Sequence, residues 1–317
     1  MNERIAVATP IIWNHPVLRR EIRAALPAAK VYEGAQVMDE DELIAFLKGH
    51  DAAIIGFEPL TEKVLAALPE LKVVSKFGAG YESFDFHAMR KHGLRFGYTW
   101  GVNKLAVAEL TLCFMIAALR WVAPLNLAMR QGQRPRYRNG RLLTGRVVGI
   151  HGCGNVGKEV VRLLKPFNCT ILATDIQDYS GFYAENGVTP VSFDTLLERS
   201  EVLTLHLPKT GATKGLYTRA ALERLREDCV LINTCRGGIV DEAALLDRLN
   251  SGALTAASFD VFAVEPCDND ELLNHPNMLG TPHIGASAEE IRLATLRAAL
   301  RGLDEHEPVD PTKYYAD

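Results

Sequence analysis

Short apolar runs alternate with helical patterns along the first hundred residues of the chain. Four of these runs are short enough to be buried strands, at residues 5–8, 53–55, 73–75 and 94–96. Between them, residues 41–48 and 60–68 repeat apolar residues at the spacing of an amphipathic helix. Alternation of strands and helices at this pitch predicts a parallel, doubly wound sheet.

A longer helix is expected from residue 103 onward. Its apolar residues lie nearly all round, which is typical of a helix buried in a core or between two subunits. A second series of strands is predicted at 147–150, 171–173, 202–205, 230–233 and 256–259. A closing helix is expected over about 288–303, followed by a tail that is mostly solvated surface.

The composition is that of an ordinary globular protein. Of 317 residues, 48% are apolar and 23% are charged, so two domains are expected and a disordered chain is not. A formal charge of −4 offers no basic field to attract nucleic acid or an anionic membrane. The N-terminus shows no signal-peptide pattern, and no apolar run reaches the roughly 18 residues of a membrane span.

Six cysteines are scattered along the chain without a CxxC pair. Most of them lie inside apolar runs or beside glycines. We interpret them as reduced thiols of a cytoplasmic protein, so neither a disulfide nor a metal site is expected.

The first motif that suggests a chemical role is a strand that runs through GxGxxG into a helix. Its glycines are Gly152, Gly154 and Gly157, and a second strand ends at Asp175, 18 residues after the last of them. The glycines allow a tight turn, close approach of a pyrophosphate and close packing of the helix, whose N–H groups hold phosphate. Asp175 suits the ribose hydroxyls of NAD and would repel the 2′-phosphate of NADP. The alternative is a turn that only tightens packing.

An arginine follows the strand at 230–233. Arg236 stands just before two glycines, which is a costly place for a cation that merely needs solvent. A guanidinium there could bind a substrate carboxylate by two hydrogen bonds and polarise a neighbouring carbonyl. The alternative is an arginine paired to a structural aspartate.

Two further segments lie at or just past predicted strand ends, where open α/β sheets bind ligands. Asp260 ends the strand at 256–259, Glu265 lies in the turn after it, and His283 follows a proline. A histidine paired with a carboxylate is the usual acid–base unit, and Glu265 is the nearest sensible partner. A lone histidine is, however, more often structural than catalytic.

Together these residues resemble the D-isomer-specific 2-hydroxyacid dehydrogenase family, the phosphoglycerate dehydrogenase-like group. The likeness covers about residues 52–303. It rests on an ordered set of motifs: 59–61 with 68–72, 78–81, 101–103 with 106–109, the glycine turn with Asp175, 206–208, the Arg236 segment, 260–266 and 281–285.

The resemblance implies roles for individual residues. Arg236 would bind and polarise a 2-oxo acid, and His283 would exchange the proton under the influence of Glu265. The dinucleotide would be lined by Gly152, Gly154, Asn155, Val156, Gly157, Asp175, His206, Leu207, Pro208, Thr234, Cys235, Asp260, Gly285 and Ala286. The substrate side would be formed by Lys76, Gly78, Ala79, Gly80 and Trp100, with Arg236 opposite them.

The resemblance also implies a discontinuous arrangement. A Rossmann-type NAD-binding domain over 101–285 would be inserted into a flavodoxin-like substrate domain made of 1–100 and 286–317. Two chain crossings at one boundary would form a hinge that closes the cleft and excludes water. The helix after Asn103 fits the core of the family's homodimer.

Some positions depart from the family pattern. Trp100 stands where a proline is usual, and we expect Trp100 and Phe57 to line or border the substrate cleft. The alternative is that Trp100 packs under the hinge. Around Phe57 an arginine typical of phosphoglycerate-oxidising members is absent, and Glu58 would repel a phosphate.

An arginine-rich stretch runs over residues 130–141, within a chain that is net acidic. It is interpreted first as a solvated face or as salt bridging to a partner subunit. The alternative is an arm that senses a dianionic 2-oxo acid in the partner's cleft, through arginines such as Arg134, Arg136 and Arg138.

The sequence thus predicts an NAD-dependent dehydrogenase or reductase of a small 2-hydroxy or 2-oxo acid. The competing hypothesis is an NAD(H)-sensing binding protein of the corepressor type, because that branch of the family keeps similar residues.

Overall fold

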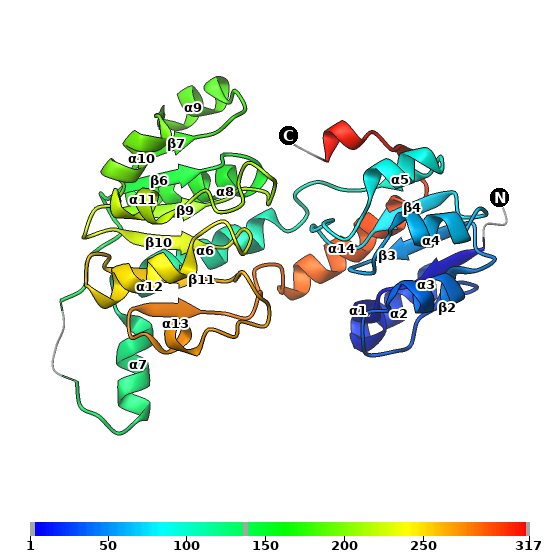
Figure 1. The fold of residues 1–317 in the computed structure, drawn as a ribbon, viewed down its shortest axis with the longest axis horizontal. Helices are drawn as coiled ribbons and strands as arrows, with labels where there is room; N and C mark the ends of the chain where they lie inside the picture. Colours follow the sequence, from blue (N-terminus) through cyan, green and yellow to red (C-terminus); the bar gives the residue numbers. More distant parts are fainter. Residues whose placement is uncertain (1–3, 136–138, 315–317) are drawn as a thin grey trace. The chain divides into compact units, whose positions relative to one another are not determined.

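The computed structural model describes residues 4–135 and 139–314 (Figure 1). Its backbone divides into two compact units, one made of residues 4–103 and 287–314 and the other of 104–135 and 139–286. Each unit is an open sheet with helices on both faces. The predicted fold class, two doubly wound α/β domains, is confirmed.

The first unit is built on a six-stranded sheet of order β13-β5-β4-β3-β1-β2. Its strands are β1 (Ile5–Val7), β2 (Lys30–Val31), β3 (Ala52–Ile55), β4 (Val73–Lys76), β5 (Arg95–Gly97) and β13 (Glu307–Pro308). Its helices are α1 (Pro10–Asn14), α2 (Pro16–Ala25), α3 (Glu40–Leu47), α4 (Glu62–Ala67), α5 (Phe86–Lys91), α14 (Glu289–Arg301) and the short η2 (Pro311–Lys313). All neighbouring strands are parallel except β13, which runs antiparallel to β5.

Alternation along the strands of the first unit feeds two cores. In β3, Ala53 and Ile55 pack with α3, α4 and α5, whereas Ala52 and Ile54 pack with α2 and α14. Helix α3 starts at a capping box in which Asp39 accepts from the Glu42 N–H while the Glu42 side chain accepts from the Asp39 N–H. A fully parallel region buried on both faces explains why these strands read as continuous apolar runs.

The second unit is built on a seven-stranded, all-parallel sheet of order β12-β11-β10-β9-β6-β7-β8. Its strands are β6 (Val147–His151), β7 (Thr170–Thr174), β8 (Val188–Pro190), β9 (Val202–Leu205), β10 (Val230–Asn233), β11 (Ala256–Phe259) and β12 (Met278–Gly280). Its helices are α6 (Lys104–Leu119), α7 (Val122–Arg130), α8 (Asn155–Leu164), η1 (Lys165–Phe167), α9 (Ser180–Asn186), α10 (Phe193–Arg199), α11 (Arg219–Glu223), α12 (Glu242–Asn250) and α13 (Asp270–Asn274).

The strands of the second unit also divide their side chains between two faces. Leu203 and Leu205 of β9 join a core with α10, α11, α12 and α13, whereas Val202 joins a core with α6 and α8. All seven strands run in one direction, so their carboxyl ends share one edge of the sheet. The loops that carry the candidate site residues leave from that edge.

Helices α6 and α7 differ sharply in burial. Residues such as Phe114 and Met115 of α6 are buried against the sheet, but a stripe that includes Leu105 and Ile116 is exposed. Helix α7 has no buried residue, and it extends away from the rest of its unit (Figure 1). Within residues 4–135 and 139–314 no single helix is long and apolar enough to cross a membrane, although α6 and α7, bent by 68°, would pass that test together.

The C-terminal segment is less solvated than its composition suggested. Strand β13 pairs with β5, Val309 and Pro311 are buried, and the ring of Tyr314 stacks on Phe86. The prediction of a mostly solvated tail holds for most of residues 304–314, but Val309, Pro311 and Tyr314 anchor this otherwise polar segment to the first unit.

Candidate active site

His283 and Glu265 are brought together at the carboxyl edge of the second sheet. His283 Nδ1 lies 2.7 Å from Glu265 Oε2, and both side chains are partly exposed, at 46% and 37%. The other carboxylate oxygen, Oε1, accepts from the Phe262 N–H at 3.2 Å. The carboxylate is thus fixed by the chain before it holds the ring, and this fixes which ring nitrogen faces outward.

Asp260 holds the loop that carries His283. It is buried, and its Oδ1 accepts from the Thr281 hydroxyl at 2.5 Å and the Ile284 N–H at 2.7 Å, while Oδ2 accepts from the Gly285 N–H at 2.7 Å. These bonds fix the backbone on both sides of His283. His283 itself has a φ of 55°, which is uncommon for a residue other than glycine and indicates that the surroundings impose its conformation.

Arg236 lies on the loop after β10, and Asn233 shapes that loop. The Asn233 side chain donates to the Arg236 carbonyl at 3.0 Å and accepts from the Cys235 N–H at 3.1 Å. The Arg236 guanidinium donates to the Cys235 carbonyl at 2.7 Å, and the residue is half-buried.

Gly237 brings the Arg236 loop against the loop that carries Glu265. A Cβ at position 237 would collide with the carbonyl of Phe262, so only glycine fits this close approach. Phe262 in turn holds Glu265 through its N–H. Arg236, Glu265 and His283 therefore belong to three loops of one unit that are joined by short backbone contacts.

A cavity of about 500 Å³ opens beside the His283–Glu265 pair. Its lining includes Asp260, Phe262, Glu265, Thr281 and His283. A volume in this range is that of a small-molecule site.

The glycine turn has the geometry that a dinucleotide requires. At Gly152, which has a φ of 90°, a Cβ would strike the carbonyl of His206, and at Gly157 a Cβ would strike the carbonyl of Gly152. At Gly154, by contrast, a Cβ would meet nothing within 4 Å. The turn is therefore crowded on its inner side and open at the second glycine, which leaves space at the start of α8, the place expected for a pyrophosphate.

Asp175 ties the end of β7 to the glycine turn. Its two carboxylate oxygens accept from the Cys153 N–H at 2.5 Å and from the Gln177 N–H at 2.9 Å. Each oxygen keeps acceptor capacity for a ribose hydroxyl. This arrangement agrees with an NAD site, and it also explains why an aspartate is useful there before any ligand binds.

Other predicted cofactor residues use their side chains within the protein. The hydroxyl of Thr234 is bonded to that of Thr111 in α6 at 2.8 Å, and Cys235 Sγ to Asn233 at 3.1 Å. His206 Nε2 lies 3.1 Å from Thr204, whereas its Nδ1 is buried without a partner among the described residues. Burial lowers the pKa of His206 to about 3, so this ring is neutral at physiological pH.

The predicted substrate residues of the first unit lie where β4 ends. Gly78, with a φ of 111°, opens the loop of Gly78, Ala79 and Gly80. Lys76 is 3% exposed, and its ammonium donates to the carbonyls of Gly56 at 2.6 Å and Phe77 at 3.0 Å. Lys76 is thus held inside the unit and does not project as a surface cation.

Glu58 differs from the expectation that it would face and repel a phosphate. It is fully buried, and its Oε2 accepts from the Gly56 N–H at 2.7 Å. Burial raises the pKa of Glu58 and the nearby Lys76 opposes that shift. Phe57 and Trp100, which are expected to line or border the substrate cleft, are exposed at 54% and 49%.

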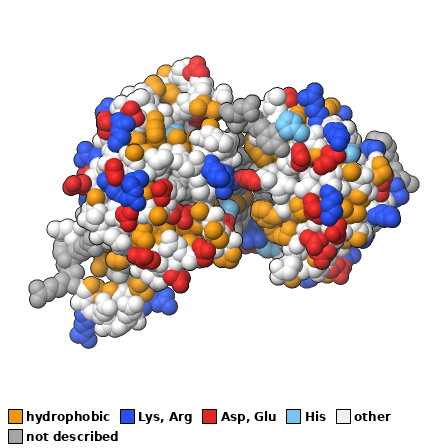
Figure 2. Space-filling view, viewed as in Figure 1, with side chains coloured by type: hydrophobic (Ala, Val, Ile, Leu, Met, Phe, Trp, Pro, Cys, Tyr) orange, Lys and Arg blue, Asp and Glu red, His pale blue; other side chains and the backbone are white. Residues whose placement is uncertain are grey.

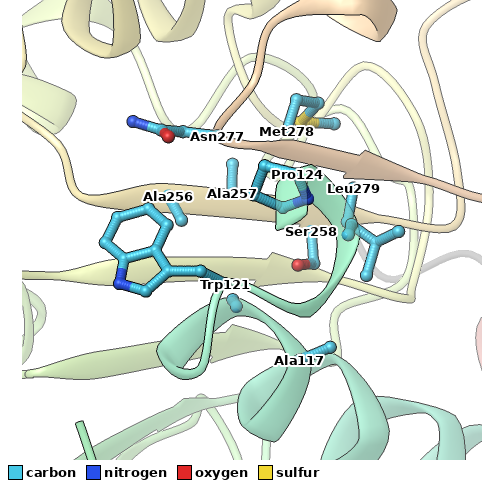
Figure 3. Close-up of a pocket in the computed structure, with 11 residues that line it drawn as sticks. Ala117, Trp121, Pro124, Ala256, Ala257, Ser258, Asn277, Met278 and Leu279 are labelled. Carbon is cyan, nitrogen blue, oxygen red and sulfur yellow. The ribbon is translucent and has the colours of Figure 1, made fainter. Parts of the chain in front are cut away.

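A separate apolar pocket lies under the turn between α6 and α7 (Figure 3). Ala117, Trp121 and Pro124 line one side, and Ser258 and Met278 on β11 and β12 line the other. The Ser258 hydroxyl is buried without a partner among the described residues. None of the residues predicted for catalysis lines this pocket, which is therefore distinct from the candidate active site and lies where α7 begins.

The arginine-rich stretch is described only in part. Arg141 donates to the Asp228 carbonyl at 2.5 Å and lies 3.5 Å from its carboxylate, so it serves a structural purpose within its own unit. Arg134 is exposed, and Arg136 and Arg138 lie outside the described residues.

Sequence reasoning missed Asn233, Thr281 and Tyr314. The first two hold the site loops through hydrogen bonds. A polar residue at the carboxyl end of a buried strand is a usable signal for Asn233, and the position beside His283 is one for Thr281. Tyr314 had no local signal, because the rings that its side chain contacts belong to residues far away in the sequence.

The comparisons with known proteins agree with this geometry. A family model described as "D-isomer specific 2-hydroxyacid dehydrogenase, NAD binding domain" matches residues 112–285. The chain belongs to the D-isomer specific 2-hydroxyacid dehydrogenase family. The predicted family and the predicted NAD cofactor are both confirmed.

Individual relatives cover different shares of their own length. The chain is 34% identical over 254 residues to a D-3-phosphoglycerate dehydrogenase of Mycobacterium tuberculosis, which covers 80% of this chain and 48% of that protein. The chain therefore spans about half the length of this relative. It is 29% identical over 282 residues to a hydroxypyruvate reductase of Thermotoga maritima, which covers 87% of this chain and 91% of that protein.

Among solved structures, a glyoxylate reductase from Paecilomyes thermophila superposes with a TM-score of 0.85. The two are 26% identical, and the match covers 96% of this chain and 95% of the other.

Proposed function

We propose that the protein is an NAD-dependent oxidoreductase that interconverts a small 2-hydroxy acid and its 2-oxo acid. The observation that carries this proposal is the His283–Glu265 pair at 2.7 Å, set beside a cavity and fixed to the Arg236 loop through Gly237 and Phe262. Carbonyl reduction requires a proton donor and a group that stabilises the developing negative charge, and a histidine held by a fixed carboxylate and an arginine provide them.

In the reducing direction, bound NADH supplies a hydride to the C2 carbon of the 2-oxo acid. Arg236 holds the substrate carboxylate and stabilises the negative charge that develops on the C2 oxygen. His283 donates a proton from Nε2 to that oxygen, and Glu265, bonded to Nδ1, stabilises the protonated ring beforehand. In oxidation the same ring accepts the proton.

The remaining binding roles follow the resemblance. Backbone N–H groups of Gly78, Ala79 and Gly80 meet the substrate carboxylate from the first unit. Asn155, Val156, His206, Leu207 and Pro208 line the dinucleotide with the glycine turn, and so do Gly285 and Ala286. The Nδ1 of His206, buried and without a partner in the part of the chain that the structure describes, supports a polar contact there. The Asp260 carboxylate acts mainly by holding the His283 loop.

The test is oxidation of NADH, followed at 340 nm, with a panel of 2-oxo acids. We expect turnover by the wild type and loss of turnover with Arg236→Ala. Turnover that survives this substitution would disprove the assigned role of Arg236.

The competing function is an NAD(H)-sensing binding protein of the corepressor type. It shares the glycine turn and Asp175, so cofactor binding alone does not separate the two. Binding of NADH without turnover of any acid in the panel would favour the sensor.

We further propose that the protein is a homodimer joined through α6 and α7. The exposed apolar side chains there include Leu105, Ile116, Val122, Leu127 and Met129, the last at 68% exposure. Figure 2 shows hydrophobic side chains on the surface of the segment that holds α7. A monomer rarely exposes so many apolar residues on two consecutive helices, and a second copy of these helices is the complementary surface.

Sedimentation equilibrium tests the dimer. Leu127→Asp combined with Met129→Asp is expected to yield a monomer, whereas a wild type that is monomeric at micromolar concentration would contradict the proposal.

The free cysteines agree with a cytoplasmic setting, which thiol labelling of the protein in cells would examine.

A further inference from the structure

An aromatic cluster covers the carboxyl end of β5 in the first unit. Tyr81, from the loop after β4, is at its centre, with edge-to-face contacts to Tyr98, Trp100 and Tyr314 at centroid distances of 5.7, 5.9 and 5.6 Å. Tyr98 and Trp100 also contact each other at 4.8 Å. Three chain segments therefore meet in one set of rings.

Tyr314 connects the cluster to the core. Its ring stacks on the buried Phe86 at 4.0 Å with an interplanar angle of 6°, and on Trp100 at 5.6 Å with an angle of 10°. Trp100 is 49% exposed. The order is thus a buried ring, the tyrosine of the C-terminal segment and then an exposed indole, so Tyr314 supports the ring that faces outward.

The cluster is attached to the glycine loop that is proposed to bind the substrate carboxylate. Tyr81 directly follows Gly80, and the Tyr98 hydroxyl donates to the Ala79 carbonyl at 2.7 Å. Ligands of open α/β sheets bind at the carboxyl ends of the strands. A substrate whose carboxylate is held at residues 78–80 therefore has these rings close by within this unit.

Charge at the same edge disfavours a second anionic group. In the described loops at residues 56–59, 76–83 and 98–103 Lys76 is the only cation, against Glu58 and Glu82. Lys76 is buried and already donates to two carbonyls, and Glu58 lies close enough to influence it. Phe57, at 54% exposure, adds a further apolar surface beside the Lys76 ammonium.

We propose that Trp100 and Tyr314 determine substrate specificity, and that together with Tyr81 they select a 2-oxo acid with an aromatic or large apolar side chain. Tyr314 acts as a positioning residue, because it stacks behind Trp100 and holds the indole at its exposed place. The inference rests on the proposed oxidoreductase function and names the substrate class that the same site takes.

The experiment compares kcat/KM for phenylpyruvate, glyoxylate and phosphohydroxypyruvate in the full-length protein. We expect the wild type to prefer phenylpyruvate. Trp100→Ala and Tyr314→Ala should each lower the ratio of phenylpyruvate to glyoxylate by about tenfold, the range expected for one aromatic contact. Tyr314→Phe, which keeps the ring, should restore most of that ratio.

Phe46→Ala is the matched control. Phe46 makes a similar edge-to-face contact with Tyr32 in the same unit, at 5.6 Å, but lies in α3. It should leave the ratio unchanged even if it lowers the melting temperature. A ratio unmoved by Trp100→Ala and Tyr314→Ala, or a wild type that prefers the phosphorylated acid, would overturn the proposal, and the second result would favour the arginine arm instead.

A binding measurement separates this inference from the proposed function. Phenylpyruvate should quench tryptophan fluorescence in the presence of NADH, and Trp100→Phe should abolish that change. Quenching without turnover would retain the aromatic site and reject the oxidoreductase. Turnover without quenching and without a specificity change would do the reverse.

Discussion

The loops at the carboxyl ends of the two sheets are held in place by different kinds of interaction. In the second unit, Asp260, Glu265 and Asn233 fix the loops through hydrogen bonds between carboxylate or amide oxygens and backbone N–H groups. In the first unit the corresponding loops are held by edge-to-face ring contacts around Tyr81 and Trp100. One fold therefore supplies two kinds of surface.

The difference follows from what each surface has to do. Proton transfer requires donor and acceptor atoms within a few tenths of an ångström of their places, and short hydrogen bonds provide that precision. Recognition of an apolar group requires area and shape, which rings provide without desolvating a charge. The polar loops carry the proposed chemistry, and the aromatic loops carry the proposed choice of substrate.

The strongest way to break this comparison is to replace the histidine. His283→Asn should lower kcat by about 10²–10⁴-fold, the usual contribution of a general acid or base. Asparagine tolerates the left-handed backbone at this position better than most residues, so the loop should survive. Steady-state kinetics gives the effect, and His87→Asn on the exposed face of α5 is the control. A loss below tenfold would place the proton donor elsewhere.

Glu265→Gln tests the polar loops more finely. Glutamine keeps an oxygen to accept from the Phe262 N–H but removes the charge next to the imidazolium. We expect kcat to fall by about 10–100-fold, since a hydrogen bond to a charged group contributes about 1.5–3 kcal/mol. Steady-state kinetics measures the effect, and an unchanged kcat would mean that Glu265 is not the partner of His283 in catalysis.

Gly237→Ala tests the backbone contact that joins two polar loops. The added Cβ meets the Phe262 carbonyl, so we expect a loss of about 1–3 kcal/mol in the free energy of unfolding together with reduced activity. Gly211→Ala is the matched control, because a Cβ there meets nothing within 4 Å. Equal stability of the two variants by chemical denaturation would show that the loops tolerate separation.

Asp175→Ser tests the cofactor end of the second unit. The substitution removes the charge that accepts from Cys153 and Gln177 and that would hold the ribose. The Kd for NADH should rise by about tenfold and discrimination against NADPH should weaken. Fluorescence titration with both cofactors measures this, and a wild type that already binds NADPH more tightly would contradict the role given to Asp175.

Ser75→Ala is the smallest change and concerns the first unit. The buried Ser75 hydroxyl donates to the Ala299 carbonyl at 2.6 Å and so joins β4 to α14. Its loss should cost about 0.5–1.5 kcal/mol in the free energy of unfolding and leave turnover unchanged. A change in substrate preference would show that the sheet face and the aromatic loops are coupled.

Prediction from the sequence worked where a pattern is local and long. The four-residue and five-residue strands β3, β6 and β9 and the glycine turn with Asp175 show themselves in continuous apolar runs and fixed spacing. Strands β2, β8, β12 and β13, of two or three residues each, were not predicted, and length alone does not explain this, because β1 and β5 also have three residues and were predicted.

Some features of the candidate site could also be predicted from local sequence, whereas others depend on tertiary packing. Arg236, Glu265 and His283 could be predicted as site residues because they follow strand ends. The pairing of His283 with Glu265 was a hypothesis, because a sequence does not show contact between residues 18 positions apart. The burial of Glu58 and the stacking of Tyr314 on Trp100 depend on how distant segments pack, and no local pattern carries that information.

The interrupted course of the first unit has a consequence for biosynthesis. Residues 4–103 leave the ribosome before α14, which is made about 180 residues later, but one face of their sheet, with Val7, Ile54 and Phe77, packs against that helix. At about 5–20 residues per second, that face waits roughly 10–40 seconds for its cover. The second unit, continuous in sequence, has no such delay. During translation the nascent first unit is therefore the natural client for a chaperone, and slow synthesis would prolong its exposure.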